Sequence, residues 1–344
     1  MVLTRVRLLL VVLLVSLYLS LRSSLATQLY LLLRLPFVWT DSSAESVISL
    51  ERDRFDVTFH SYPALPSFDD SDPSATTSTA ESELRVPVRL HHIHLGTAEL
   101  RPEWQTARTE CLKHHPTWEP YLWDDAAATR LVREEFPEIA GLWESYPYLV
   151  QRVDALRYMV LYKYGGAILD FDLVCRRPLD PLRQFDFVAP AAHPAGFSIG
   201  MMLASPNHSF LADLVHHLPA FNRRWFLLPY ATVMFSAGCH YASTIYTMQR
   251  NRTSLRILSG PPTDPNMHML NGFVDTPLFQ HLGTSSWHAH DVTAFRVLNA
   301  ARRSWTCLVA FGIGFGVVVL VVVGTLGVMR RSSRRDGSVI TKAA

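Results

Sequence analysis

Asp170 and Asp172 stand two residues apart in a short apolar segment, residues 167–174, which reads AILDFDLV. In a β-strand, residues two apart point to the same face. Two like charges on one face of an apolar strand are costly unless a cation neutralises them. Carboxylate oxygens suit Mg²⁺ or Mn²⁺, and such a cation can also bridge a diphosphate. The pattern therefore indicates a divalent-metal site, with two water-facing carboxylates at a strand end as the competing interpretation.

A charged pair precedes this segment within a largely apolar helical pattern. Residues 149–164 have strong helical character, and Gly165-Gly166 follows as a C-terminal cap. Asp154 and Arg157 are three residues apart and therefore neighbours on one helix face. Charged side chains of this kind can hydrogen-bond the hydroxyls of a sugar. A structural salt bridge is the competing interpretation.

The elements that would position these side chains alternate between strands and helices. Strands are expected at 86–96, 119–125 and 167–174, and helices are expected at 101–114, 126–136 and 149–164. Such alternation is typical of an α/β domain with a mostly parallel central sheet. Ligands of open sheets bind beyond the carboxyl ends of the strands, and the two aspartates lie towards such an end.

Two apolar stretches, residues 8–21 and 307–329, contribute much of the 49% hydrophobic content. The second has no charged residue and is long enough to cross a bilayer as a helix. The first is expected to be a membrane anchor, with a cleaved signal peptide as the alternative. Basic residues before the first stretch and after the second predict cytosolic termini. The segment between them would then face the lumen of the Golgi or the endoplasmic reticulum.

Composition divides the chain into expected regions. These are a membrane-anchor region at 1–33, a stem or linker at 34–84, the folded domain at 85–300, a transmembrane helix at 306–329 and a basic cytosolic tail at 330–344. The stem prediction depends on residues 66–83, which are acidic, rich in hydroxyl groups and poor in large apolar side chains.

Net charge and cysteine content limit the partners and the compartment. The net charge of +2 gives no indication of a nucleic-acid partner. Cys111, Cys175 and Cys239 would lie in an oxidising compartment if the predicted topology holds. One disulfide can form among these three residues, and the sequence does not identify the pair.

The segment QRVDALRYMVLYKYGGAILDFD resembles the core motif of the DxD glycosyltransferases of family thirty-two. Two later segments, RRWFLLPYATVMFSAGCHYASTIY at 223–246 and GTSSWHAHD at 283–291, are similar to one branch of it. That branch is the fungal inositol phosphorylceramide mannosyltransferases. The three segments occur in the family's order, and the resemblance covers roughly residues 86–291. It implies a single nucleotide-sugar-binding, GT-A-like α/β domain, flanked in this chain by the two predicted membrane segments.

The resemblance also implies roles for the residues of the central motif. Asp172 would be the principal metal ligand. Asp170 would contact the metal, the ribose and the sugar. Asp154 and Arg157 would hold the donor sugar. His94, in the first expected strand, would lie near the nucleotide base.

The late segment would complete the site. Trp287 would close over the donor diphosphate and help to hold the donor sugar. Ser285, His288 or His290 would complete the metal shell, because neutral imidazole is a common metal ligand. A surface histidine cluster is the competing interpretation for His288 and His290.

The resemblance implies a retaining mannosyltransferase that depends on Mn²⁺ or Mg²⁺. Its donor would be GDP-mannose, and its acceptor the membrane lipid inositol phosphorylceramide, in sphingolipid synthesis. A regulatory membrane subunit is an expected partner, because the resembling enzymes work with one. The alternatives are a Golgi α-mannosyltransferase that acts on protein-linked glycans and a non-catalytic regulatory homologue. The second alternative stays open because Ile168 and Leu173 depart from the family pattern.

Overall fold

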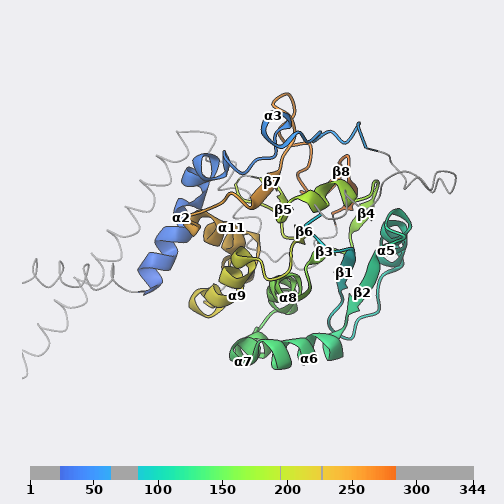
Figure 1. Cartoon of the computed structure of the whole chain (residues 1–344). Helices are drawn as coiled ribbons and strands as arrows, with labels where there is room; N and C mark the ends of the chain where they lie inside the picture. The colour runs from blue at the N-terminus through green and yellow to red at the C-terminus, as the bar shows by residue number, and fades with distance from the viewer. Residues whose placement is uncertain (1–23, 63–83, 194, 226–227, 284–344) are drawn as a thin grey trace, which may run out of the picture. The chain divides into compact units, whose positions relative to one another are not determined.

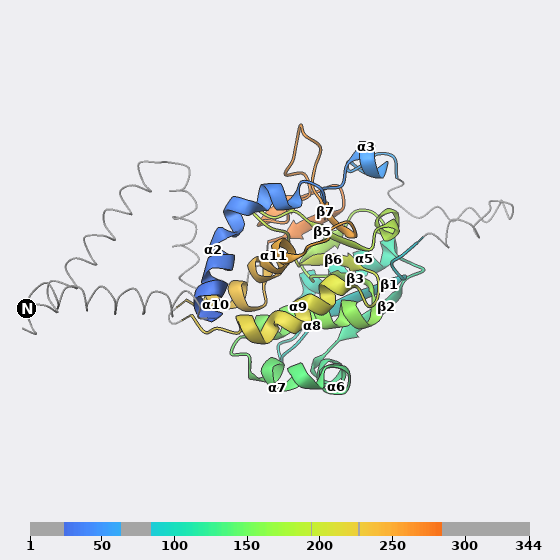
Figure 2. The same cartoon turned by 60° about the vertical axis from the view of Figure 1, so that its left-hand side comes forward.

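The computed structural model describes residues 24–62, 84–193, 195–225 and 228–283, which all fall within one compact unit, Met1–Trp287 (Figure 1, Figure 2). Within these ranges, no helix has both the length and the apolar character needed to cross a bilayer. The predicted membrane segments at 8–21 and 307–329 lie outside the described residues, as do the acidic residues 66–83.

Strands of two sheets make up the centre of this unit. The described strands are β1 (Arg89–Ile93), β2 (Glu119–Trp123), β3 (Gly166–Leu169), β4 (Leu173–Cys175), β5 (Phe187–Pro190), β6 (Met201–Ala204), β7 (Leu255–Leu258), β8 (Phe273–Asp275) and β9 (Phe279–Leu282). Among the described residues, a six-stranded sheet has the order β2-β1-β3-β6-β5-β7, and a smaller antiparallel sheet has the order β4-β9-β8. In the larger sheet only β6 runs against its neighbours, so the sheet is mostly parallel as predicted.

Most of the described helices cover one face of the larger sheet, and one helix and the smaller sheet pack on the other face. The described helices are α2 (Ser24–Ser43), α3 (Leu50–Asp53), α5 (Pro102–His114), α6 (Asp125–Glu135), α7 (Pro137–Ser145), α8 (Leu149–Tyr164), α9 (Ser209–Phe221), α10 (Pro229–Ser236) and α11 (Cys239–Met248), with a 3-10 turn at Asp180–Gln184. Successive strand residues face opposite sides of the sheet. Ile168 therefore joins the apolar cluster of α8, α9 and α11, whereas Ala167 and Leu169 join the cluster of α5 and the smaller sheet.

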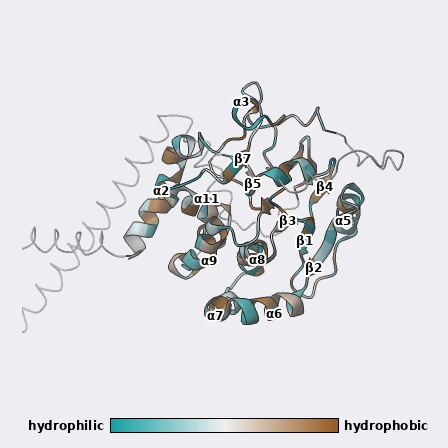
Figure 3. Cartoon of the chain, viewed as in Figure 1, coloured by the Kyte–Doolittle hydropathy of each residue, from teal (hydrophilic) through white to brown (hydrophobic). Residues whose placement is uncertain are grey.

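Local sequence signals account for most of these elements. The helices expected at 101–114, 126–136 and 149–164 are confirmed as α5, α6 and α8. α8 ends at Tyr164, and the capping residue Gly165 has a φ of 62° and donates its N–H to the carbonyl of Leu161 at 2.9 Å. A positive φ is cheap only for glycine, so the predicted cap is confirmed. The edge strand β2 is mostly hydrophilic, as Figure 3 shows in teal.

The prediction of one strand over 167–174 was wrong, because the chain turns at Asp170. β3 ends at Leu169 in the larger sheet, and β4 begins at Leu173 in the smaller one. The Asp170 N–H donates to the carbonyl of Gly200 at 2.8 Å, and the Leu173 N–H donates to the carbonyl of Asp170 at 3.2 Å. The two aspartates therefore lie in a turn between two sheets, and the face-sharing rule for one strand does not apply to them.

The predicted stem at 34–84 was wrong for residues 34–62, which pack into the domain. Leu35 and Trp39 of α2 are buried in the helical core, and Phe55 and Phe59 are buried in the second core. The predicted anchor region at 1–33 likewise includes the first half of α2, where Leu32 is 2% exposed. The buried apolar residues of α2 recur at helical spacing. They therefore form one face of the helix, and this face packs on α11.

A specific hydrogen bond fixes α2 on α11. Pro36 lies inside α2 and has no N–H, so the carbonyl of Leu32 loses its partner within the helix. His240 Nε2 donates to that carbonyl at 2.7 Å. Burial lowers the pKa of His240, so the ring is neutral and carries its proton on Nε2. The contact satisfies the group that proline leaves unpaired.

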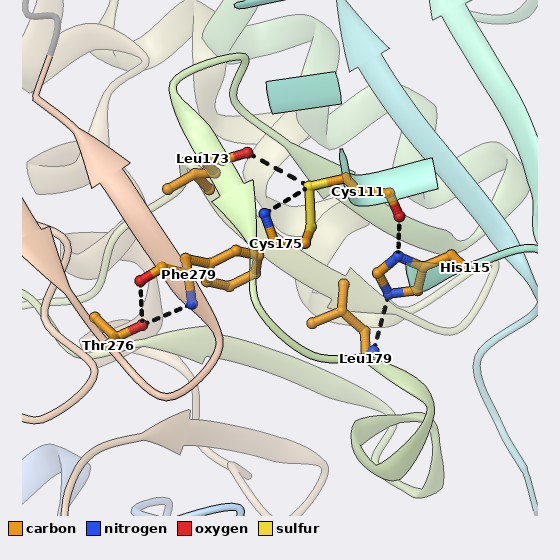
Figure 4. The surroundings of a disulfide bond; sticks show 7 residues. All are labelled: Cys111, His115, Leu173, Cys175, Leu179, Thr276 and Phe279. Atoms are coloured by element: carbon orange, nitrogen blue, oxygen red, sulfur yellow. Dashed lines mark hydrogen bonds between the residues drawn. A yellow bond between two sulfur atoms is a disulfide. The ribbon is translucent and has the colours of Figure 1, made fainter. Parts of the chain in front are cut away.

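Cys111 and Cys175 form a disulfide that joins α5 to β4, with 4.7 Å between their Cα atoms (Figure 4). The Cys175 N–H also donates to Cys111 Sγ at 3.1 Å. Beside them, His115 Nε2 accepts from the Leu179 N–H at 2.9 Å, so its Nδ1 donates to the Cys111 carbonyl (Figure 4). The structure thus identifies the pair that the sequence left open, and Cys239 is not disulfide-bonded.

Replacing both Cys111 and Cys175 by alanine should lower the free energy of unfolding by about 2–4 kcal/mol, because the bond closes a long loop. The two residues are 64 apart in sequence. Denaturant unfolding of the oxidised chain measures this difference, with Cys239→Ser as the control that removes an unbonded thiol. Equal unfolding midpoints for the wild type and the double variant would contradict the assignment.

Candidate active site

A cleft of about 490 Å³ lies beyond the carboxyl ends of β1 and β3. His94 follows β1 and Asp170 follows β3, and both side chains line the cleft. α8 contributes Asp154 and Arg157, and the first residue of α11, Cys239, also lines the cleft. The position agrees with the general rule that open α/β sheets bind ligands at the carboxyl ends of their strands.

Arg157 holds two carboxylates together at the floor of this cleft. Its Nη1 lies 3.0 Å from Asp154 Oδ1, one helical turn earlier, and its Nη2 bonds Asp170 Oδ1. Nη1 also donates to the carbonyl of Ile199 at 3.4 Å. The side chains of Arg157 and Asp154 are 9% and 6% exposed, whereas that of Asp170 is 35% exposed. The predicted pair is therefore a buried salt bridge that extends to the first aspartate of the DxD motif.

Burial dominates the electrostatics of both carboxyls. It raises the pKa of Asp154 to about 7, although the charge of Arg157 opposes the shift. It raises the pKa of Asp170 to about 6, again against Arg157 and with help from the charge of Asp172. A cation bound beside Asp170 would favour its ionised form, so this turn is electrostatically suited to a positive ligand. Burial also raises the pKa of the Cys239 thiol to about 11, which keeps it protonated and unreactive.

The second aspartate of the motif pairs with a histidine from β9. Asp172 Oδ2 lies 3.2 Å from His281 Nε2, and both side chains are mostly buried. The backbone joins the same elements, because the Leu282 N–H donates to the Asp172 carbonyl at 2.8 Å. The carbonyl of Gly272 can only accept, so His281 Nδ1 carries a proton and donates to it at 2.6 Å. Burial lowers the pKa of His281, but its bond to Asp172 outweighs this and the net shift is upward.

Asp172 and His281 have the chemistry and orientation of metal ligands. Proteins commonly orient a metal-binding imidazole by bonding its other nitrogen to a carbonyl, as Gly272 does here. Carboxylate and imidazole together suit Mn²⁺ and related divalent cations. In the part of the chain that the structure describes, no three acidic, histidine or cysteine side chains converge on one metal position. The chemistry of these two residues fits part of a metal shell, and a bound cation would need further ligands from other groups.

An aromatic wall forms the other side of the cleft. Trp104 stacks on Phe171 with 6.2 Å between ring centroids and 23° between planes. The guanidinium of Arg101 lies 4.7 Å from the centre of the Trp104 ring. His94 meets Phe171 edge-on at 5.9 Å, and its Nε2 donates to the carbonyl of Ala98 at 2.8 Å. Flat faces with a nearby cation suit a planar, negatively charged ligand.

The structure brings together one part of the predicted site. The predicted residues that line the cleft are His94, Asp154, Arg157, Asp170 and Asp172. The remaining predicted residues lie outside the described ranges, and these are Ser285, Trp287, His288 and His290.

Two cleft residues were missed by reasoning from the sequence. His281 stands two residues before Gly283, which is the first residue of the late segment GTSSWHAHD. Its closeness to that segment is a usable signal. Trp104 is the only aromatic residue in the otherwise polar segment PEWQTARTECLKH, which is a second signal. Neither signal shows by itself that these side chains meet the DxD turn.

Comparison with known proteins places this site in a family. The model of the "Glycosyltransferase sugar-binding region containing DXD motif" matches residues 101–188, which include the Asp154 to Asp172 part of the cleft. The chain is 33% identical over 261 residues to inositol phosphoceramide mannosyltransferase 1 of Schizosaccharomyces pombe, covering 71% of this chain and 76% of that protein. It is 31% identical over 240 residues to mannosyl phosphorylinositol ceramide synthase SUR1 of Saccharomyces cerevisiae, covering 68% and 59%.

A solved structure, the PaToxG glycosyltransferase, is similar to 47% of this chain with a TM-score of 0.39 and 14% identity, covering 69% of that structure. The family assignment depends on the sequence matches instead. This chain belongs to the DXD-motif glycosyltransferase family that includes the fungal inositol phosphoceramide mannosyltransferases.

A side chain at Gly200 is expected to displace the Asp170 carboxylate, because an added Cβ would lie 2.8 Å from Asp170 Oδ2. Gly200→Ala should displace this carboxylate and lower the rate of glycosyl transfer at least about tenfold, the effect of a small misplacement in an active site. Gly141→Ala on α7 is the matched control, since an added Cβ there meets no atom within 4 Å. Initial rates and melting temperatures should be measured for both variants. A Gly200→Ala enzyme with the wild-type rate would contradict this account of the turn.

Proposed function

We propose that this chain transfers mannose from GDP-mannose to inositol phosphoceramide, with retention of configuration and with Mn²⁺ or Mg²⁺ as cofactor. The observation that carries the proposal is the Asp154–Arg157–Asp170 cluster next to the Asp172–His281 pair in one cleft. The two fungal relatives are a mannosyltransferase and a synthase of inositol phosphoceramide lipids, which supports the sugar and the lipid of the proposal.

The charged cluster is suited to hold the donor sugar. Arg157 is fixed by Asp154 and Asp170, so its remaining N–H groups and the free carboxylate oxygens have set directions. Groups fixed in advance need little reorganisation during the reaction, which is the main source of electrostatic catalysis. The wall of Trp104 and Phe171 offers a flat surface for the nucleotide base.

Asp172 and His281 are the described residues that would hold the cation, and Ser285 and His288 are the proposed further ligands from outside the described ranges. A bound divalent cation would neutralise the charge that builds on the departing diphosphate. Arg101 lines the same cleft and would add a second positive charge.

Retention is proposed to occur by attack from the side on which the diphosphate leaves. Asp154 and Asp170 are both bonded to Arg157, which leaves neither placed as a free nucleophile. The acceptor hydroxyl would form the new bond to the anomeric carbon while the bond from that carbon to the diphosphate oxygen breaks. The hydroxyl proton would pass to the departing diphosphate.

We further propose that the domain works in the lumen of the Golgi or the endoplasmic reticulum, with both termini in the cytosol. The Cys111–Cys175 disulfide supports this, because such bonds persist in oxidising compartments. A regulatory membrane subunit is part of the proposal, supported by the resemblance of residues 223–246 to the fungal enzymes.

The departures from the family pattern do not favour a non-catalytic homologue. Ile168 is 1% exposed in the core of the sheet, and Leu173 is equally buried in β4. Both positions therefore affect packing, whereas the carboxylates of Asp170 and Asp172 are present and line the cleft.

A transfer assay with the full chain tests the proposal. GDP-mannose, Mn²⁺ and inositol phosphoceramide in detergent or vesicles should yield the mannosylated lipid, detected by mass spectrometry, with an α-anomeric product. Asp172→Asn should lower the rate at least about 100-fold, because it removes a charged metal ligand. Asp264→Asn, in an exposed turn, is the matched control and should keep the wild-type rate.

Three results would contradict the proposed function. The first is a rate of mannosyl transfer that stays unchanged when divalent cations are removed by a chelator. The second is equal rates for the wild type and Asp172→Asn. The third is transfer to a protein-linked glycan in place of the lipid, which would favour the Golgi glycan enzyme.

A further inference from the structure

α2 has two apolar faces, and only one of them packs against the domain. Leu32 and Leu35 are buried, whereas Tyr30, Leu33 and Phe37 are 63%, 63% and 78% exposed. The three exposed residues are spaced by three and four positions, so they form one outward stripe along the helix. Figure 3 shows apolar colouring along α2, which agrees with this pattern. A contiguous exposed apolar stripe marks an interaction surface, unlike single exposed apolar residues.

The position of α2 in the chain limits what this stripe can face. The apolar residues 8–21 end two residues before α2 begins at Ser24. The three residue steps from Leu21 to Ser24 span at most about 11 Å. Tyr30 lies about 9 Å further along the helix axis. If residues 8–21 enter a bilayer, the start of the stripe is therefore within reach of its headgroup region.

Charges along α2 are distributed as a lipid surface requires. Arg223 is exposed, and its Nε donates to Gln28 Oε1 at 3.3 Å, which places it beside the first turns of the helix. The guanidinium of Arg34 lies 5.5 Å from the centre of the Tyr30 ring. The exposed acidic residues Asp41 and Glu45 lie at and beyond the other end of the helix. The two basic groups therefore lie beside the first turns and at the middle of the helix, next to the exposed stripe, and basic groups beside an apolar stripe favour anionic lipid headgroups.

We propose that Tyr30, Leu33 and Phe37 form an interfacial surface that lies on an anionic phospholipid bilayer. Contact with lipid here does not depend on the proposed activity. One consequence does depend on it: His240 bonds α2, and the preceding residue Cys239 lines the cleft. α2 on the bilayer would therefore hold the cleft close to the surface that contains a lipid acceptor.

Photo-labelling by lipid tests the surface directly. The full chain is reconstituted in vesicles of phosphatidylcholine and phosphatidylserine that contain a phospholipid with a diazirine near its headgroup. After irradiation, peptides covering residues 27–40 should carry lipid. Leu33→Glu combined with Phe37→Glu should reduce this labelling at least about fivefold, because two charges oppose insertion into the interface. Vesicles without phosphatidylserine should label the same peptides less.

Leu122→Glu is the matched control, since Leu122 is a 48% exposed apolar residue on the edge strand β2. Figure 1 and Figure 2 both show β2 and α2 on opposite sides of the domain. This variant should leave the labelling of residues 27–40 unchanged, and melting temperatures verify that both variants fold.

Absence of label from residues 27–40 of the wild type would overturn the proposal, whether or not residues 8–21 or 307–329 are labelled. That result would mean that another part of the chain or a second copy covers the stripe. Labelling requires no GDP-mannose, so a labelled but inactive chain would count against the proposed function alone.

Discussion

Arg157 is buried on α8 between the carboxylates of Asp154 and Asp170, and the arrangement of the cleft depends on that guanidinium. Removing Arg157 would leave the buried Asp154 carboxylate without its counter-charge, and breaking a buried ion pair typically costs about 3–5 kcal/mol. Asp154 lies on the same helix, whereas Asp170 follows β3, so the ion pairs join helix and sheet at one point. A group held in this way points at the cleft in a fixed direction before any ligand arrives, which is what an electrostatic site requires.

The turn between β3 and β4 is the second constraint. It moves the chain from the larger sheet to the smaller one within three residues, and thereby brings Asp172 to His281 on β9. The disulfide holds β4 on α5 just beyond this turn. Asp170 therefore belongs to the Arg157 cluster that we propose holds the sugar, and Asp172 to the His281 pair that we propose holds the cation. This division of roles follows from the two sheets, because a single continuous strand would have placed both carboxylates on one face.

Signals within a few residues predicted much of the fold and part of the site. The helical spacing of Asp154 and Arg157 and the glycine cap after them are local, and both were correct. The turn at Asp170 was not predictable, because apolar residues continue on both sides and the partner strand β9 is distant in sequence. His281 was missed for the same reason. In α2, composition does not distinguish apolar residues that enter the core from those that face outward, and Leu32 and Leu33 differ only in their direction on the helix.

In the proposed site, Asp172 and His281 hold a cation that donor binding requires. Calorimetric titration of GDP-mannose into the full chain at increasing Mn²⁺ concentration tests it most directly. His281→Ala should raise the half-saturating Mn²⁺ concentration at least about tenfold, the usual effect of removing part of a metal shell. His216→Ala, an exposed residue of α9, should leave it unchanged. Equal Mn²⁺ dependence for the wild type and His281→Ala, or full donor affinity without any divalent cation, would contradict the account.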